Sequence, residues 1–75
     1  MKILLFGVLS DVVKAQYIEI THVSTTDELI KYLEDKFPDF KKYNYQIALN
    51  HKKTNGNLHI NITDEIALLP PFAGG

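Results

Sequence analysis

The chain has 75 residues, which is enough for one small domain burying about 60% of the surface that its unfolded form exposes. It contains no cysteine, which excludes a disulfide framework, a thiolate zinc site and a cysteine nucleophile. The eight basic residues are all lysine, and nine acidic residues bring the net charge to −1, which argues against a nucleic-acid partner. With 45% hydrophobic residues the chain is too apolar to be disordered.

The sequence also lacks the features that direct a protein to a membrane. No apolar run reaches the roughly 18 residues that span a bilayer. The run near the N-terminus is not followed by a small-residue cleavage site, so it does not resemble a signal peptide. We therefore expect a cytoplasmic protein with no membrane partner.

The first half of the chain predicts two strands and one main helix. Residues 2–9 form a nearly continuous apolar run, typical of a strand buried on both faces. A single helical turn is expected over residues 11–16, and alternation over residues 17–22 predicts a half-exposed strand. The segment TTDE at residues 25–28 fits a capping box, and apolar residues then recur at helical spacing. Pro38 stops this helix or starts a new turn.

The second half predicts three strands, over residues 45–50, 58–62 and 65–69. Asn55-Gly56 indicates a hairpin turn, because both residues tolerate positive φ. The first and last strands are the most apolar, so we expect them to lie side by side, parallel, in the middle of the sheet.

These elements predict an α+β fold of the β-grasp (ubiquitin-like) type. It consists of a mixed four- or five-stranded sheet with one main helix packed on one face. We assign residues 1–69 to this domain and residues 70–75 to an extended, flexible C-terminal tail.

Side chains that could carry out chemistry are few and scattered. The three histidines are not at metal-ligand spacing, and Asp27 and Glu28 belong to the helix N-terminus, where negative charge is favourable. A domain of this size has little volume for a pocket that separates the pKa values of two carboxyl groups. We therefore expect no metal site, no bound cofactor and no catalytic side chain. Lys41-Lys42 and Lys52-Lys53, near two tyrosines, suggest a nucleic-acid patch only weakly, because the chain is slightly acidic overall.

The C-terminal sequence LLPPFAGG (residues 68–75) is the most informative segment. Pro70-Pro71 cannot continue a strand ladder and favours an extended chain, and Phe72 places a large apolar group beyond the sheet. Gly74 and Gly75 have no side chain, so they fit a narrow channel in another protein. The Gly75 carboxylate can then react once it has been activated, for example by adenylation with ATP.

An activated terminus of this kind is compatible with several functions. It can accept sulfur to become a thiocarboxylate, or accept a lysine amine as a ubiquitin-like protein modifier does. A sulfur carrier for another product, such as thiamine, and a binding module with an inert tail remain further alternatives.

The chain resembles the ubiquitin-like MoaD/ThiS family of sulfur carriers, and within it the small subunits of molybdopterin synthase. The resemblance spans nearly the whole chain and is carried by KILLFG at residues 2–7, TTDELIKYLEDKF at 25–37, ALN at 48–50 and DEIALLPPFAGG at 64–75. The acidic pair, the apolar strand, Pro-Pro and terminal Gly-Gly together are far more specific than Gly-Gly alone.

The resemblance implies a role in molybdenum cofactor biosynthesis. An activating enzyme would use ATP to adenylate Gly75, and sulfur transfer would give a thiocarboxylate. The tail would enter the large subunit of a heterotetrameric molybdopterin synthase, which supplies the active-site side chains, and sulfur would pass to cyclic pyranopterin monophosphate. The expected site residues are Gly75 as the reacting group, Gly74, Ala73, Phe72, Pro71 and Pro70 in the tail, and Leu68 and Phe6 as docking groups on the sheet.

Overall fold

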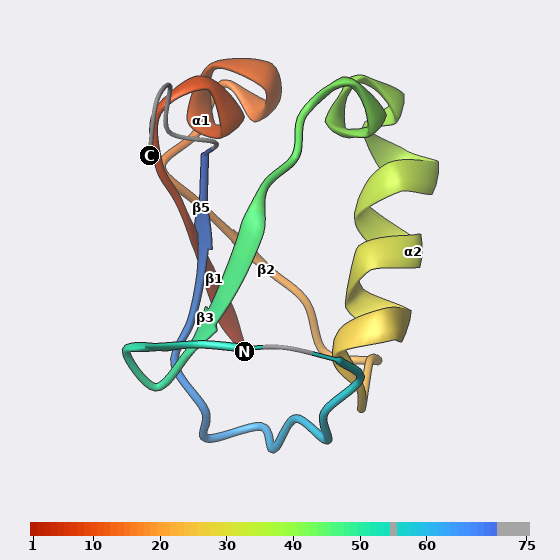
Figure 1. Ribbon diagram of the computed structural model, residues 1–75, viewed down its shortest axis with the longest axis vertical. Coiled ribbons are helices and arrows are strands. Elements are labelled where there is room, and N and C mark those ends of the chain that lie inside the picture. Colours follow the sequence, from red (N-terminus) through yellow and green to blue (C-terminus); the bar gives the residue numbers. More distant parts are fainter. Residues whose placement is uncertain (55, 71–75) are drawn as a thin grey trace.

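In the computed structural model, which describes residues 1–54 and 56–70, a helix crosses one face of a mixed sheet (Figure 1). The strands formed by these residues lie in the order β2-β1-β5-β3-β4. The first and last strands are parallel neighbours in the interior of the sheet, and the other pairs are antiparallel. The predicted β-grasp fold is confirmed. The strands are β1 (Lys2–Leu5), β2 (Tyr17–Glu19), β3 (Gln46–Leu49), β4 (Lys52–Lys53) and β5 (Ile66–Leu69).

The main helix, α2 (Thr26–Lys36), begins at the predicted capping box. The Thr25 hydroxyl accepts a hydrogen bond from the backbone amide of Glu28 at 3.2 Å. The Glu28 carboxylate accepts in return from the backbone amides of Ser24 and Thr25, at 2.8 and 3.1 Å, and these hydrogen bonds lower its pKa. The helix ends before Phe37, and Pro38 starts a 3-10 helix, η1 (Pro38–Lys42), as one of the two expected alternatives.

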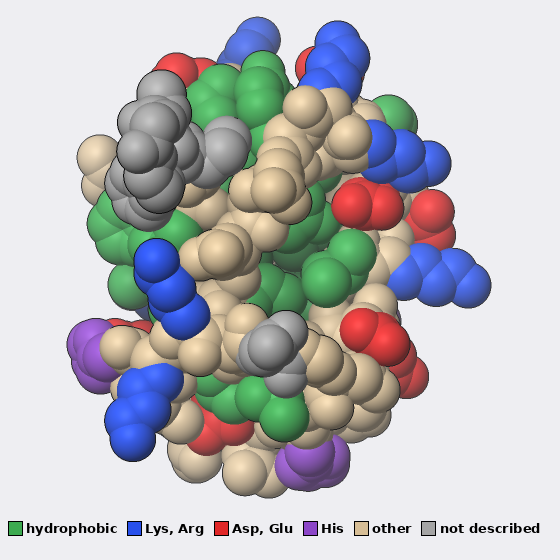
Figure 2. Space-filling model, viewed as in Figure 1, with side chains coloured by type: hydrophobic (Ala, Val, Ile, Leu, Met, Phe, Trp, Pro, Cys, Tyr) green, Lys and Arg blue, Asp and Glu red, His purple; other side chains and the backbone are tan. Residues whose placement is uncertain are grey.

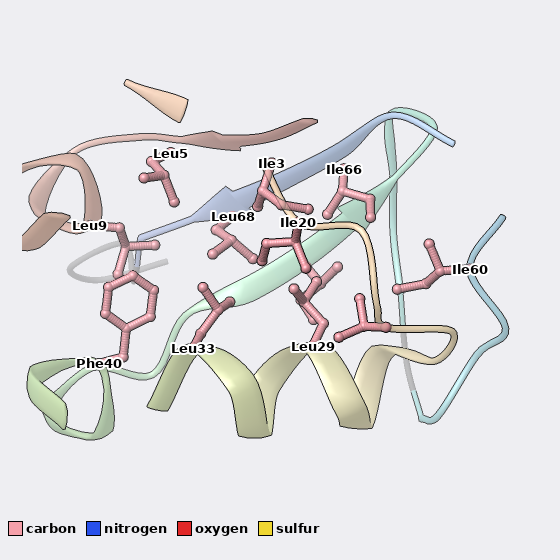
Figure 3. Close-up of a cluster of buried hydrophobic side chains, with 12 residues drawn as sticks. Ile3, Leu5, Leu9, Ile20, Leu29, Leu33, Phe40, Ile60, Ile66 and Leu68 are labelled. Carbon is pink, nitrogen blue, oxygen red and sulfur yellow. The ribbon is translucent and has the colours of Figure 1, made fainter. Parts of the chain in front are cut away.

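The hydrophobic core lies between the sheet and α2 (Figure 3). Leu29 and Leu33 project from α2 toward side chains of β1 and β5. At one end of this layer, Leu9 and Phe40 face one another. Each of these side chains is worth about 1.5–3 kcal/mol on full burial. The fully buried core residues are Ile3, Leu9, Leu29, Leu33, Phe40, Ile66 and Leu68.

The strand predicted over residues 2–9 is too long. β1 ends at Leu5, and Gly7, with φ 58° and ψ −134°, turns the chain into a short helix, α1 (Val8–Val13). Leu9 therefore reaches the core from a helix rather than from a strand. The helical turn expected over residues 11–16 lies earlier than predicted, because α1 ends at Lys14 in the left-handed conformation. Val8 and Leu9 are apolar because they cover one end of the core, which a strand pattern does not distinguish.

A tight turn lies earlier in the chain than the turn predicted at Asn55-Gly56. The chain reverses between β3 and β4 at Asn50 and His51, whose φ values are 53° and 71°. Two consecutive residues with positive φ form the kind of tight turn that joins antiparallel strands. Asn55 lies outside the described residues.

Residues 58–62 do not form the predicted strand. Their backbone instead pairs with the segment that leads into α2: His59 makes an isolated bridge with Thr25, and the Ile60 amide donates to the Ser24 carbonyl at 2.7 Å. Of the three alternating apolar residues, only Ile60 is buried, whereas Leu58 is 39% and Ile62 70% exposed. The alternation here therefore does not correspond to one buried face, and a loop can have the same sequence pattern as a strand.

Replacing Thr25 by Ala tests the capping box. We expect Thr25→Ala to lower the free energy of unfolding by about 1 kcal/mol, because one helical amide loses its acceptor. For a domain of this size that corresponds to a fall in Tm of roughly 4–8 °C. Thr21→Ala, at an exposed threonine outside the helix, is the matched control and should leave Tm nearly unchanged. Equal losses in the two variants would contradict this role of Thr25.

Candidate functional site

β5 ends at the same end of the sheet as β1, because the two strands are parallel neighbours. β1 and β5 are parallel, with Leu5 opposite Leu68, so the residues that follow each strand emerge side by side (Figure 1). Pro70 consequently lies against Gly7, close to the first turn of α1. The segment that the sequence predicts to be reactive is therefore attached at a defined point of the fold.

The face of the sheet opposite α2 carries a group of apolar side chains that we call the open-face patch: Leu4, Phe6, Ala48, Ala67 and Leu69. Successive side chains of a strand point to opposite faces, so these residues alternate with the core residues of the same strands. Leu4 and Ala48 lie opposite Ala67 on either side of β5. The two small alanines leave a groove of about 290 Å³ between the larger side chains.

The groove is bounded at one end by the paired side chains of His51 and Glu65. His51 Nε2 lies 2.9 Å from Glu65 Oε2, and both side chains line the groove. Because both are largely exposed, this pair contributes little to stability, but it fixes polar groups beside the apolar patch. Figure 2 shows hydrophobic side chains over the sheet at the left edge of the molecule, with lysine and histidine side chains below them.

Asn50 ties the β3–β4 turn to the start of β5. Its side-chain amide donates to Asp64 Oδ1 at 3.1 Å, and its side-chain oxygen accepts from the Glu65 amide at 3.0 Å. Asp64 Oδ2 also accepts from the Asn61 amide at 2.7 Å, and the hydrogen bonds from Asn61 and Asn50 hold the pKa of Asp64 below its usual range. The ALN and DE segments noted in the sequence therefore contact one another and set the position of β5.

Phe6 stands between two hollows of the surface. With Leu4 it lines the groove on the open face, and it also lines a second hollow of about 380 Å³ formed with Gly7, Ser10 and Gln16. Its side chain is 46% exposed. A large apolar group that is accessible from two sides can be enclosed by a partner, as interface residues with large energetic effects usually are.

Of the two docking groups predicted on the sheet, only Phe6 lies at the surface. Leu68 is fully buried and is part of the core between the sheet and α2, so it cannot contact a partner. The adjacent residues Ala67 and Leu69 occupy the open face instead. Pro70 is partly buried. The remaining predicted tail residues, Pro71, Phe72, Ala73, Gly74 and Gly75, lie outside the described residues.

The sequence prediction did not include Leu4, Ala48, Ala67, Leu69 or Gly7. A run such as IALL does not show which alternate residues face the helix. The small residue Ala67 could have indicated which residues of β5 face away from the helix, since bulky side chains are more often placed in the core.

The described residues contain no cluster that suggests catalysis. They include no group of three or more His, Asp or Glu residues placed to hold a metal ion.

The Tyr45 hydroxyl donates a hydrogen bond to the Glu34 carboxylate at 3.2 Å, and burial together with this nearby carboxylate raises the pKa of the hydroxyl. That phenol therefore remains protonated and tethers β3 to α2. No helix in the described part of the chain is long and apolar enough to cross a membrane.

The fold and this edge of the sheet define the class: a ubiquitin-like β-grasp protein in which the last strand leads out beside an apolar surface. The protein belongs to the ThiS family, whose model matches residues 3–75, and thus to the ThiS/MoaD group of sulfur carriers and related ubiquitin-like proteins. The structure is similar to the crystal structure of SAMP1 from Haloferax volcanii, with a TM-score of 0.74. The two sequences are 20% identical, and the match covers 99% of this chain and 97% of that one. At this identity the likeness concerns the fold.

The hydrogen bonds of Asp64 predict an acid-sensitive contribution to stability. Because its pKa is lowered in the folded state, its contribution is present above its ordinary pKa of 3.8 and is lost as the pH falls through the folded value. We expect Asp64→Asn to be less stable than the parent at neutral pH and to lose less stability on acidification. Thermal unfolding at a series of pH values measures this. Glu28 contributes equally in both proteins, so parallel stability curves would rule out the role assigned to Asp64.

Proposed function

We propose that this protein is a sulfur carrier and the small subunit of molybdopterin synthase. The proposal is carried by one observation: a ThiS-family chain that ends in DEIALLPPFAGG leaves its central strand beside an exposed apolar groove. The Pro-Pro spacer before Gly-Gly favours the molybdopterin pathway over the thiamine pathway. The groove and Phe6 supply a surface for a partner, and the described residues contain no cluster that could perform the reaction on its own.

The chemistry proceeds at the main-chain carboxylate of Gly75. An oxygen of this carboxylate attacks the α-phosphorus of ATP, which gives an acyl-adenylate and releases pyrophosphate. Hydrosulfide, or its equivalent from a donor, then adds to the acyl carbon, and the bond to AMP breaks as the C–S bond forms. The thiocarboxylate sulfur then forms a C–S bond with cyclic pyranopterin monophosphate as an oxygen substituent leaves that carbon. Water cleaves the acyl–sulfur bond, which leaves the sulfur on the pterin and restores the Gly75 carboxylate, and a second carrier delivers the second sulfur of the dithiolene.

The partners follow from this chemistry. An adenylating enzyme binds ATP and the tail, and the large synthase subunit binds the same tail together with the pterin substrate. Gly74 fits the channel that leads to the reacting carbon, and Phe72 and the two prolines position it. Both partners contact the open-face patch, because it is the apolar surface next to Pro70.

Intact mass spectrometry tests the carrier function. After incubation with the cognate activating enzyme, ATP and a sulfide source, we expect a mass gain equal to exchange of one oxygen for sulfur, located in the C-terminal fragment. A chain that lacks Gly74 and Gly75 is the control and should remain unmodified. Adding the large subunit and cyclic pyranopterin monophosphate should return the carrier to its original mass and form molybdopterin.

Three results would contradict the proposal in whole or in part. An unmodified carrier in the presence of an activating enzyme that consumes ATP would exclude sulfur transfer. Adducts between Gly75 and lysines of other proteins, with no thiocarboxylate formed, would instead identify a protein modifier. If the thiocarboxylate forms and the large subunit does not consume it, the sulfur has another acceptor.

The open-face patch is tested by replacing its most exposed side chain. We expect Phe6→Ser to weaken binding to the large subunit by about 10- to 100-fold, since the burial of an aromatic ring is worth about 1.5–3 kcal/mol. Ile62→Ser is the matched control, because Ile62 is an exposed apolar residue that does not line the groove. Titration calorimetry with the purified large subunit measures both. Equal affinities for the two variants would exclude docking through Phe6.

A further inference from the structure

Gly7 and Pro70 make an unusually close contact at the point where the chain leaves the sheet. A Cβ atom on residue 7 would lie 2.9 Å from Cγ and 3.4 Å from Cβ of Pro70. The first distance is shorter than any ordinary contact between carbon atoms. The proline ring therefore rests on the glycine backbone, in space that any other residue would fill.

Gly7 is hydrogen-bonded to the first turn of α1. Its carbonyl oxygen accepts from the amides of Ser10 and Asp11, at 3.1 and 3.4 Å, and from the Ser10 hydroxyl at 2.7 Å. Its φ of 58° lies in a region that favours glycine. Backbone conformation and the contact with Pro70 thus both require glycine at this position.

The other side of the contact is equally constrained. The pyrrolidine ring fixes φ of Pro70, and the following proline restricts Pro70 to extended conformations. β5 is paired with strands on both sides almost to its end. The pairing with β1 extends to Leu68, and the pairing with β3 extends to Leu69. The orientation of the ring on Gly7 consequently determines the direction in which the chain leaves the sheet.

We propose that Gly7 is a positioning residue for the C-terminal segment: it seats the Pro70 ring and directs the chain end toward the partner's active site. The part of this proposal that concerns catalysis rests on the proposed sulfur-carrier function. The five residues after Pro70 can reach at most about 17 Å. If the tail is fully extended in the partner's channel, a change of 20° in the direction of the chain at Pro70 moves the reacting carbon by about 6 Å, whereas displacements of about 1 Å can lower a rate 100-fold.

Four variants separate this role from a general effect on folding. Gly7→Ala places a methyl group against Pro70, and Pro70→Ala removes the Cγ and Cδ atoms that it would meet. In Pro70→Ala the next residue is still proline, so residue 70 stays extended. The double variant completes a cycle. Gly56→Ala is the matched control, because Gly56 also has positive φ, of 82°, and a Cβ there would meet no atom within 4 Å.

The exit direction is measured without any partner enzyme. The chain has no cysteine, so Ala73→Cys gives a unique site for a nitroxide label, and its relaxation effects on backbone amides report where the label lies. We expect Gly7→Ala to change the set of broadened amides, Gly56→Ala to leave it unchanged, and Pro70→Ala to broaden a wider set. Once Pro70 is alanine, adding Gly7→Ala should cause a smaller change than it does in the parent, because the atom 2.9 Å away is gone and only the Cβ of residue 70, at 3.4 Å, and the positive φ of residue 7 remain. The proposal is overturned if the set of broadened amides is the same in Gly7→Ala and Pro70→Ala as in the parent. It is also overturned if Gly7→Ala changes that set equally in the parent and in Pro70→Ala.

A kinetic measurement then connects direction to chemistry. With the activating enzyme, we expect Gly7→Ala to lower kcat for adenylation at least tenfold while KM changes little, since the open-face patch still docks. A higher KM with unchanged kcat would overturn the positioning role. The label patterns could change as expected while neither the parent nor any variant is adenylated. In that case the contact between Gly7 and Pro70 still sets the direction of the chain, and it is the proposed sulfur-carrier function that fails. Should Gly7→Ala fail to fold, Pro70→Ala gives the same test from the other side.

Discussion

The parallel pairing of β1 with β5 determines the form of the whole molecule. Parallel strands cannot be joined by a tight turn, so the chain between them must cross from one end of the sheet to the other. Here that connection contains α2, which covers one face, and β3, which pairs with the far side of β5. The pairing also brings the ends of the first and last strands to one edge. The proximity of Phe6, Gly7 and Pro70 is therefore a consequence of topology, although these residues are more than 60 positions apart in the sequence.

The alternation of side chains along these strands separates stability from recognition. On β5, Ile66 and Leu68 are fully buried, whereas Ala67 and Leu69 line the groove on the opposite face. A substitution on the first face therefore acts on folding, and one on the second face changes the exposed apolar groove. The small side chains of Ala48 and Ala67 form this groove without exposing the core.

The sequence predicted the features that depend on local chemistry or on total hydrophobicity. The capping box at Thr25 was recognisable because it needs only residues close in sequence, and the central parallel strands followed from their apolar composition. Features that depend on tertiary contacts were missed. β1 ends before Gly7 because the apolar residues that follow Gly7 cover the core from a helix. The tight turn lies at Asn50, where Asp64 and Glu65 provide hydrogen-bond partners. The direction of Leu68 could not be derived, since alternation has two equivalent phases.

The small size of the domain supports the proposed division of function between the chain and its partners. Within the described residues no group of three or more His, Asp or Glu side chains could hold a metal ion, and in the proposed function a partner shields the activated carboxylate from water. The fold instead places an apolar surface beside Pro70, the last described residue of the chain. In the proposed function, a partner that covers Phe6 therefore also lies next to Pro70. If the two proposals hold, partner specificity depends on the exposed side chains of the open-face patch and on the contact between Gly7 and Pro70, whereas the buried side chains determine stability.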